Sequence, residues 1–224
     1  MRTRNVLLLF LAVFCVAAVF GVARARPGAG ESSAAPEIAL PAPRTTGTVS
    51  VEEALARRRS VRSFAAKELT LDQVGQLAWA AQGITEPKRG LRTAPSAGAV
   101  YPLEVYLAKS DGVFHYVPQG HQLHQVSDVD KRSDLSGQAS VRDAPLDVVI
   151  AGNFERMRAK FGANTDRFVY IEAGHVGQNI HLHAVALGLA SVSVGGFDPA
   201  AATQALDLPA DQTVLYIIPV GYAR

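Results

Sequence analysis

Residues 57–62 read Arg57-Arg58-Arg59-Ser60-Val61-Arg62 and end a short predicted helix, Val51–Arg58. Cations at the C-terminal end of a helix gain about 0.3 to 1 kcal/mol from the helix dipole, which explains part of the cluster. Arg58, Ser60 and Arg62 alternate, however, and alternate side chains of an extended chain point to one side. The arginines of this segment are therefore either placed at a helix end because the helix dipole favours cations there, or they form a binding site for a phosphate or a polyol.

Helices and strands follow this segment without a regular βαβ order. Capping boxes formed by Ser50 with Glu53 and by Thr70 with Gln73 predict two helix starts. The predicted helices are 51–58, 71–82 and 167–187, with a further start at Asp198-Pro199, and the predicted strands are 103–109, 113–117, 147–151, 189–194 and 214–220. This order favours an α+β fold over a doubly wound parallel sheet.

Two other stretches are rich in small residues. The first is Ala94-Pro95-Ser96-Ala97-Gly98-Ala99-Val100-Tyr101-Pro102, and the second is Gly195-Gly196-Phe197 after a predicted strand. Small side chains let a backbone approach a flat ligand closely, although a plain connector or turn has the same composition. Each stretch alone is therefore a weak indication of a site.

In this order along one chain, the three motifs resemble the FMN-dependent nitroreductase family. The similarity extends from about Val51 to Gly221. Residues 172–179, Glu-Ala-Gly-His-Val-Gly-Gln-Asn, resemble the branch that contains the SagB-type azoline dehydrogenases. The resemblance implies a nitroreductase-like α+β fold, in which helices flank a central, mostly antiparallel sheet. It also implies a homodimer with FMN in a cleft at the interface.

The resemblance assigns roles to the motif residues. Arg58 and Ser60 correspond to residues that hold the FMN phosphate, and Arg62 to the basic residue facing the ribityl chain or the pyrimidine edge. The first small-residue stretch corresponds to a wall of the flavin site, and the glycine pair to the turn whose backbone N–H reaches flavin N5. The expected cofactor-binding residues are Arg58, Arg59, Ser60, Arg62, Pro95, Ser96, Gly98, Gly195, Gly196 and Arg224.

Lys160 is the candidate catalytic residue. The azoline-dehydrogenase branch has a Lys-Tyr pair ahead of the long helix, and Lys160-Phe161 corresponds to it, so the lysine remains as a base but the phenol is missing. The expected function is hydride transfer through flavin N5 to or from a small organic substrate, with a small-molecule electron donor and acceptor. The alternatives are a non-catalytic extracytoplasmic flavin-binding protein and an azoline dehydrogenase acting on a modified peptide.

The N-terminal sequence is typical of an exported protein. Residues 1–25 combine Arg2 and Arg4 with an apolar run and the sequence Ala23-Arg24-Ala25, which predicts a secretory signal peptide. Residues 26–47 predict a flexible Pro/Ala/Gly-rich spacer, and 48–224 the FMN-binding domain. We expect a periplasmic or extracellular location, with membrane contact only if the signal stays uncleaved. Any clasp between subunits is expected from the segment before Ser50.

Composition excludes several other classes of protein. The 224 residues include 22 basic and 20 acidic side chains, and removing the three arginines of residues 1–25 leaves 19 − 20 = −1, so we expect no nucleic-acid partner. The single cysteine, Cys15, excludes internal disulfides and thiolate zinc sites. Glu172 and His175 form only half of a di-iron motif, so no metal is expected.

Overall fold

The structure is a computed structural model that describes residues 37–224. The predicted signal peptide lies outside the described residues, as does the first part of the predicted spacer. Within the described range, no helix combines the length and the apolar character that crossing a membrane requires.

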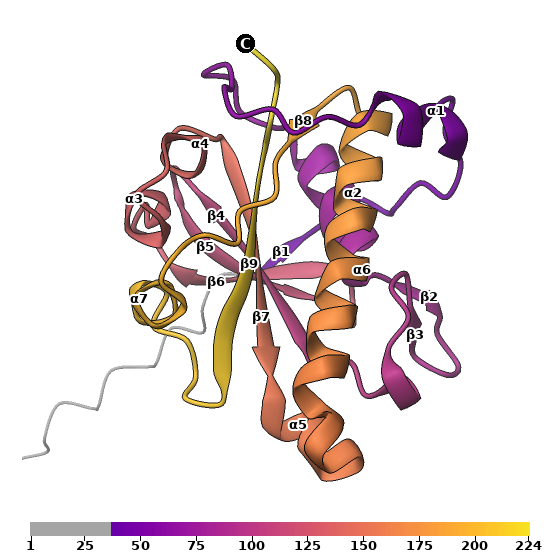
Figure 1. Ribbon diagram of the computed structural model, residues 1–224. Helices are drawn as coiled ribbons and strands as arrows, with labels where there is room; N and C mark the ends of the chain where they lie inside the picture. Colours follow the sequence, from indigo (N-terminus) through magenta and orange to yellow (C-terminus); the bar gives the residue numbers. More distant parts are fainter. Residues whose placement is uncertain (1–36) are drawn as a thin grey trace, which may run out of the picture. The chain divides into compact units, whose positions relative to one another are not determined.

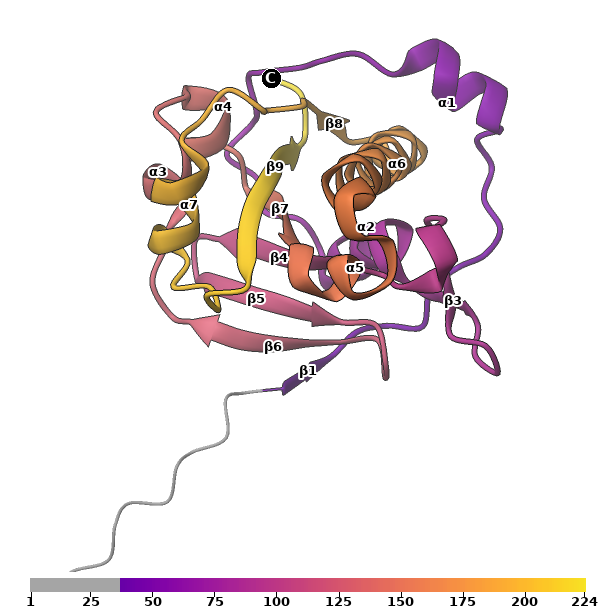
Figure 2. The same ribbon diagram turned by 60° about the horizontal axis from the view of Figure 1, so that its bottom comes forward.

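A seven-stranded sheet forms the centre of the fold (Figures 1 and 2). Its strand order is β1-β6-β5-β4-β7-β9-β8, and each neighbouring pair is antiparallel, as the resemblance implied. The strands are β1 Glu37–Ala39, β4 Leu103–Lys109, β5 Gly112–Val117, β6 Gln122–Ser127, β7 Leu146–Asn153, β8 Ala190–Ser191 and β9 Gln212–Gly221. A separate hairpin pairs β2 Ile84–Glu86 with β3 Leu91–Arg92.

Helices cover both faces of this sheet (Figure 2). The helices are α1 Val51–Arg57, α2 Leu71–Gln82, α3 Arg132–Leu135, α4 Ala139–Arg142, α5 Phe154–Phe161, α6 Thr165–Ala186 and α7 Pro199–Ala205, with 3-10 turns η1 Ala97–Ala99 and η2 Gly162–Asn164. Along β7, Val148 and Ile150 join the core that includes residues of α2 and α6, whereas Val149 and Ala151 join a second core with residues of α3, α4 and α7. Burial on both faces explains the continuous apolar run of this strand.

Local capping signals place several helix ends where the sequence predicts them. The Thr70 side chain accepts from the Gln73 backbone N–H and the Gln73 side chain reaches back to Thr70, so α2 begins at Leu71 as expected. Ser50 likewise caps α1 and Asp198 caps α7. The predicted strand 189–194 is shorter than expected, since only Ala190–Ser191 forms a regular strand beside β9.

The described part of the expected spacer belongs to the fold, which corrects that prediction. Residues 37–47, here called the N-terminal strap, add β1 to the edge of β6, with Ile38 opposite Leu123. Leu40 is only 9% exposed and its backbone N–H donates to the His121 carbonyl at 3.1 Å. The Arg44 guanidinium lies 2.7 Å from the Asp72 carboxylate. The folded region therefore starts before the expected boundary at residue 48, and this segment packs on its own subunit.

Asp147 is a buried carboxyl group near the start of β7. Its exposed fraction is 0%, and within residues 37–224 neither carboxylate oxygen has a hydrogen-bond partner. Burial raises the pKa of Asp147 well above its ordinary value, and the charge of Arg132 only partly opposes this. The fold therefore favours the protonated form of this side chain.

Shortening Leu40 to alanine should destabilise the fold, because the strap contributes this side chain to the core. We expect Leu40→Ala to lower the free energy of unfolding by about 2 kcal/mol, measured by urea denaturation. Leu71→Ala, at a position that is 45% exposed, is the matched control and should cost less than half as much. Equal effects would show that the strap does not pack as described.

Replacing Asp147 by asparagine should change how stability depends on pH. Since the folded pKa lies above the unfolded one, ionisation costs stability as pH rises through the folded pKa, and this cost is absent below the unfolded pKa. The free energy of unfolding of the wild type, relative to Asp147→Asn, should therefore fall as the pH rises above about 4, the ordinary pKa of an aspartate. The exposed Asp134→Asn is the control, and a flat wild-type difference curve contradicts the prediction.

Candidate functional site

The first motif is attached to the edge of the sheet beside β8. Ser60 forms an isolated parallel bridge with Ser191, and the Val61 backbone N–H donates to the Ser191 carbonyl at 3.1 Å. After Ser191 the chain continues through Val194, which forms a bridge with Ile217 of β9, and then reaches the Gly195-Gly196 pair. Two motifs that are far apart in the sequence thus lie along neighbouring segments.

The last residues of the chain lie beside the same segment. Phe64 pairs with Ala223, and the Arg224 backbone N–H donates to the Ser63 carbonyl at 3.1 Å. As a result, Arg62 and Arg224 line one cavity of about 540 Å³. The cations lining this cavity are Arg62, Lys67, Arg132, Arg142 and Arg224, and the anions are Glu68 and Asp143.

The arginines of this region differ in whether they form an ion pair with a carboxylate. Arg132 binds the Asp130 carboxylate at 2.6 Å and Arg142 binds Asp143 at 2.9 Å. Among residues 37–224, Arg58, Arg62 and Arg224 form no ion pair with a carboxylate side chain. An unpaired guanidinium is the group that binds a phosphate best, so this part of the molecule can receive an anionic ligand.

The predicted alternation of side chains also separates Arg59 from Arg62. Arg57, Arg59 and Val61 line a different hollow, next to the end of α6. The Arg59 guanidinium donates to the backbone carbonyls of Ala56 at 3.0 Å and Arg58 at 2.7 Å. Arg59 thus satisfies carbonyl groups at the end of its own helix.

The glycine pair presents open backbone. Gly195 and Gly196 are both exposed, and neither has a positive φ angle. A Cβ atom on Gly195 would meet no atom of the described chain within 4 Å, and one on Gly196 would meet only the Gln138 side chain at 3.9 Å. Neither conformation nor packing within the described chain therefore requires glycine here, and the pair leaves the backbone accessible to a ligand.

A second group of predicted site residues lies at the other small-residue stretch. Gly98 has a φ of +59°, and its carbonyl accepts a hydrogen bond from Lys160 Nζ at 2.8 Å. The Ser96 hydroxyl accepts from the Tyr101 backbone N–H at 2.9 Å. The fold thus brings Lys160, from α5, against the loop that contains Pro95, Ser96 and Gly98.

The two groups lie toward opposite ends of α6 (Figure 1). Gln82, near the loop, contacts Glu172 of α6 at 3.4 Å, whereas Ser191 contacts His181 of the same helix at 2.7 Å. Nine residues of helix separate these two contacts, which is about 14 Å along the axis. A single chain therefore assembles the predicted site as two separate parts.

Two buried polar residues were not among the predicted site residues. Glu172 is 2% exposed, and burial raises its pKa, while the Ser96 and Gln82 side chains partly oppose this change. His181 is 5% exposed, and burial, together with the nearby charge of Arg58, lowers its pKa to about 4. No sequence pattern indicates a role for His181, because its partners, Ser191 and Ser193, lie beyond the end of the helix and meet it only in the folded chain.

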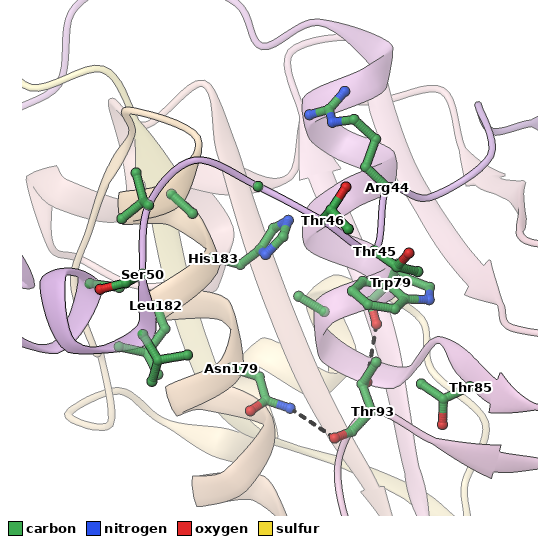
Figure 3. A pocket seen from close by; sticks show the side chains of 16 residues that line it. Arg44, Thr45, Thr46, Ser50, Trp79, Thr85, Thr93, Asn179, Leu182 and His183 are labelled. Atoms are coloured by element: carbon green, nitrogen blue, oxygen red, sulfur yellow. Dashed lines mark hydrogen bonds between the residues drawn. The ribbon is translucent and has the colours of Figure 1, made fainter.

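Another cavity, of about 490 Å³, lies between the strap, α2 and α6 (Figure 3). Trp79 and His183 form part of its wall, and Asn179 donates to the Thr93 carbonyl at 3.3 Å. It contains none of the predicted site residues. His183 bonds Gln76 of α2 at 2.9 Å, while His181 bonds the serines at β8, so this cavity and the arginine segment lie on different sides of α6.

Comparisons with known proteins show which family the sequence and the fold match. The model of the nitroreductase family matches residues 55–222. A candidate nitroreductase of Methanocaldococcus jannaschii is 39% identical over 159 residues, which are 66% of this chain and 80% of that protein. The crystal structure of a candidate nitroreductase from Ralstonia eutropha JMP134 has a TM-score of 0.79 at 32% identity, covering 89% of this chain and 94% of that one.

A more distant likeness concerns the Escherichia coli microcin synthetase complex McbBCD, solved with a truncated pro-MccB17 bound. It has a TM-score of 0.68 at 23% identity and covers 82% of this chain and 76% of that chain. This likeness extends to the fold only. The fold and the matches together define a flavin-dependent oxidoreductase. The chain belongs to the nitroreductase family.

Replacing Gly98 by alanine should move Lys160. The added Cβ would lie 2.5 Å from Lys160 Nζ, and the positive φ adds strain of about 1 kcal/mol. Gly90→Ala is the control, because Gly90 also has a positive φ (+65°), a Cβ added there would meet no atom of the described chain within 4 Å, and it lies far from Lys160 in the sequence. Both variants should lose stability, but only Gly98→Ala should alter the rate at which Lys160 reacts with an amine reagent, measured by mass spectrometry. An unchanged Lys160 rate in Gly98→Ala would be evidence against the contact.

Proposed function

We propose that this chain binds FMN along the Arg58–Arg62 segment and the Gly195-Gly196 turn and transfers hydride to or from a small organic molecule. The observation that carries the proposal is the set of arginines that have no carboxylate partner among residues 37–224. Their segment is joined by the Val61–Ser191 backbone hydrogen bond to the chain that leads to the open glycine turn. A phosphate and a flat ring need these two features, respectively. When bound, FMN supplies two-electron chemistry at N5.

The residues present fit the parts of this cofactor. Arg58, Ser60 and Arg224 would hold the phosphate, and Arg62 would face the ribityl chain or the pyrimidine edge. The backbone at Gly195 and Gly196 is open for the ring. A fixed positive charge near the pyrimidine edge favours the anionic form of the reduced ring, which is the main electrostatic influence available to Arg62.

We also propose that the active form is a homodimer. Within one chain, the loop of Ser96 and Gly98 and the arginine segment are associated with parts of α6 about 14 Å apart along its axis, and we propose that the loop completes the site of a second subunit. Exposed apolar residues are available for such an interface: Tyr170 is 58% exposed and Ile171 45% on α6, and Leu55 is 52% exposed on α1. Burying them against a second copy would remove apolar surface from water.

Azoline oxidation on a modified peptide is the second candidate function. The observation in its favour is the contact of Lys160 Nζ with the Gly98 carbonyl, which holds a basic side chain at the loop expected to line the site. The neighbouring Phe161 has no hydroxyl, so reduction or oxidation of a small molecule, which needs no dedicated side-chain base, is the simpler chemistry. We further propose that the protein is exported, on the basis of residues 1–25.

Binding of FMN tests the proposal directly. Protein reconstituted with FMN should show flavin absorbance that dithionite bleaches reversibly. Arg58→Ala and Arg224→Ala should each weaken binding about 10- to 100-fold, as expected for losing a charge-assisted hydrogen bond. Arg57→Ala is the matched control, since Arg57 pairs with Glu53 at 2.6 Å and lines a different hollow.

A folded protein that retains no flavin would contradict the proposal. Retention of flavin without oxidation of NAD(P)H or of a quinol would instead indicate a flavin-binding protein without turnover. Release of a modified peptide with an aromatic azole ring would favour the second candidate function.

A further inference from the structure

His181 connects the long helix to the strand that leads into the glycine pair. Its Nδ1 lies 2.7 Å from Ser191 Oγ and its Nε2 lies 2.8 Å from Ser193 Oγ. The ring is buried between α6 and this strand, since the residue is only 5% exposed. Both ring nitrogens are thus occupied by hydroxyl groups.

The two serines differ in their surroundings. Ser191 is buried at 3% exposure, and its carbonyl accepts from Val61. Ser193 is exposed and lies two residues before Gly195. Val192 and Val194, which alternate with the serines, are buried in the second core. The serine side chains of this segment therefore face His181, and of the two only Ser193 is exposed, two residues before the glycine pair.

The ring is neutral at ordinary pH. Burial lowers its pKa, and the nearby charge of Arg58 acts in the same direction. A neutral imidazole has one N–H donor and one acceptor nitrogen. One serine hydroxyl must therefore donate to the ring while the other accepts from it. When the ring changes tautomer, both roles reverse, and the site neither gains nor loses a proton.

We propose that His181 is a positioning residue that sets the hydrogen-bonding direction of the Ser193 hydroxyl toward the ligand held at the Gly195-Gly196 turn. When Ser193 donates to Nε2, its lone pairs face the ligand as an acceptor. When Nε2–H donates to Ser193, the hydroxyl hydrogen is directed to the ligand. The arrangement gives the site one hydroxyl that matches either a donor or an acceptor.

A hydroxyl that can either donate or accept suits a flavin ligand, and this inference rests on the proposed binding of FMN. The ring nitrogen that takes hydride is a hydrogen-bond acceptor when oxidised and a donor when reduced. A hydroxyl of fixed direction stabilises only one of these forms. A hydroxyl backed by a neutral histidine can bond to both.

Two conservative variants separate this role from a merely structural one. The amide of asparagine takes the position of Nδ1 and the amide of glutamine that of Nε2, so His181→Asn keeps the Ser191 bond while His181→Gln keeps the Ser193 bond. The measurements are the dissociation constant of oxidised FMN, by titration, and that of reduced FMN, calculated from it and the midpoint potential of the bound flavin. Thermal unfolding of each variant is measured in parallel. The matched control is His124→Asn, on the far strand β6.

We expect Ser193→Ala and His181→Asn to raise the dissociation constants of both oxidised and reduced FMN about three- to tenfold, because the hydroxyl bonds to both forms, and His181→Gln to keep most of the wild-type affinity. A tenfold loss confined to one form would shift the midpoint potential by about 30 mV and would contradict a bond to both forms. If His181→Asn resembled the wild type while His181→Gln did not, the proposal would be overturned in favour of a structural tie to Ser191. Dissociation constants that none of the three variants changes would overturn it as well. Absence of bound flavin in the wild type would be a failure of the proposed function instead, visible before any variant is compared.

Discussion

The hydrogen bond from the Val61 backbone N–H to the Ser191 carbonyl joins the arginine segment to the central sheet. Without it, Arg58 and Arg62 would lie on an irregular connection between two helices, with no fixed relation to the glycine pair. Pairing of Ser63 with Arg224 extends the same attachment to the end of the chain. Because these are backbone bonds, the relative position of the arginine segment, the strand at Ser191 and the last residues depends on chain geometry rather than on long, mobile side chains.

Helix α6 imposes the second constraint. It is 22 residues long and lies between the loop at Gly98 and the strand at Ser191, so it holds apart the two groups of residues that the sequence assigns to one ligand. Buried polar groups mark both contacts, Glu172 toward the loop and His181 toward the strand. The helix therefore sets the spacing of the site as well as forming much of the core.

The sequence predicted best where the determinants are local. The capping pair Thr70 and Gln73 fixed the start of α2, and the apolar alternation fixed β4, because neighbouring residues contain the whole signal. Strand β1 was missed because three residues form a strand only when β6 offers its edge. Other features also depend on residues that are distant in sequence. Whether Arg62 has an ion-pair partner, and which groups His181 bonds to, is decided by the tertiary fold, as is the side of the segment on which Arg59 lies. No local sequence pattern could therefore reveal them.

The strap has a consequence for the hollow beside Trp79. The side-chain amide of Gln76 contacts Arg44 from the strap and His183 from α6, so it links two residues that line this hollow. Only a few hydrogen bonds and the exposed ion pair with Asp72 hold this part of the strap down. Local opening of the strap, at a free-energy cost well below that of global unfolding, would therefore remove one side of the hollow.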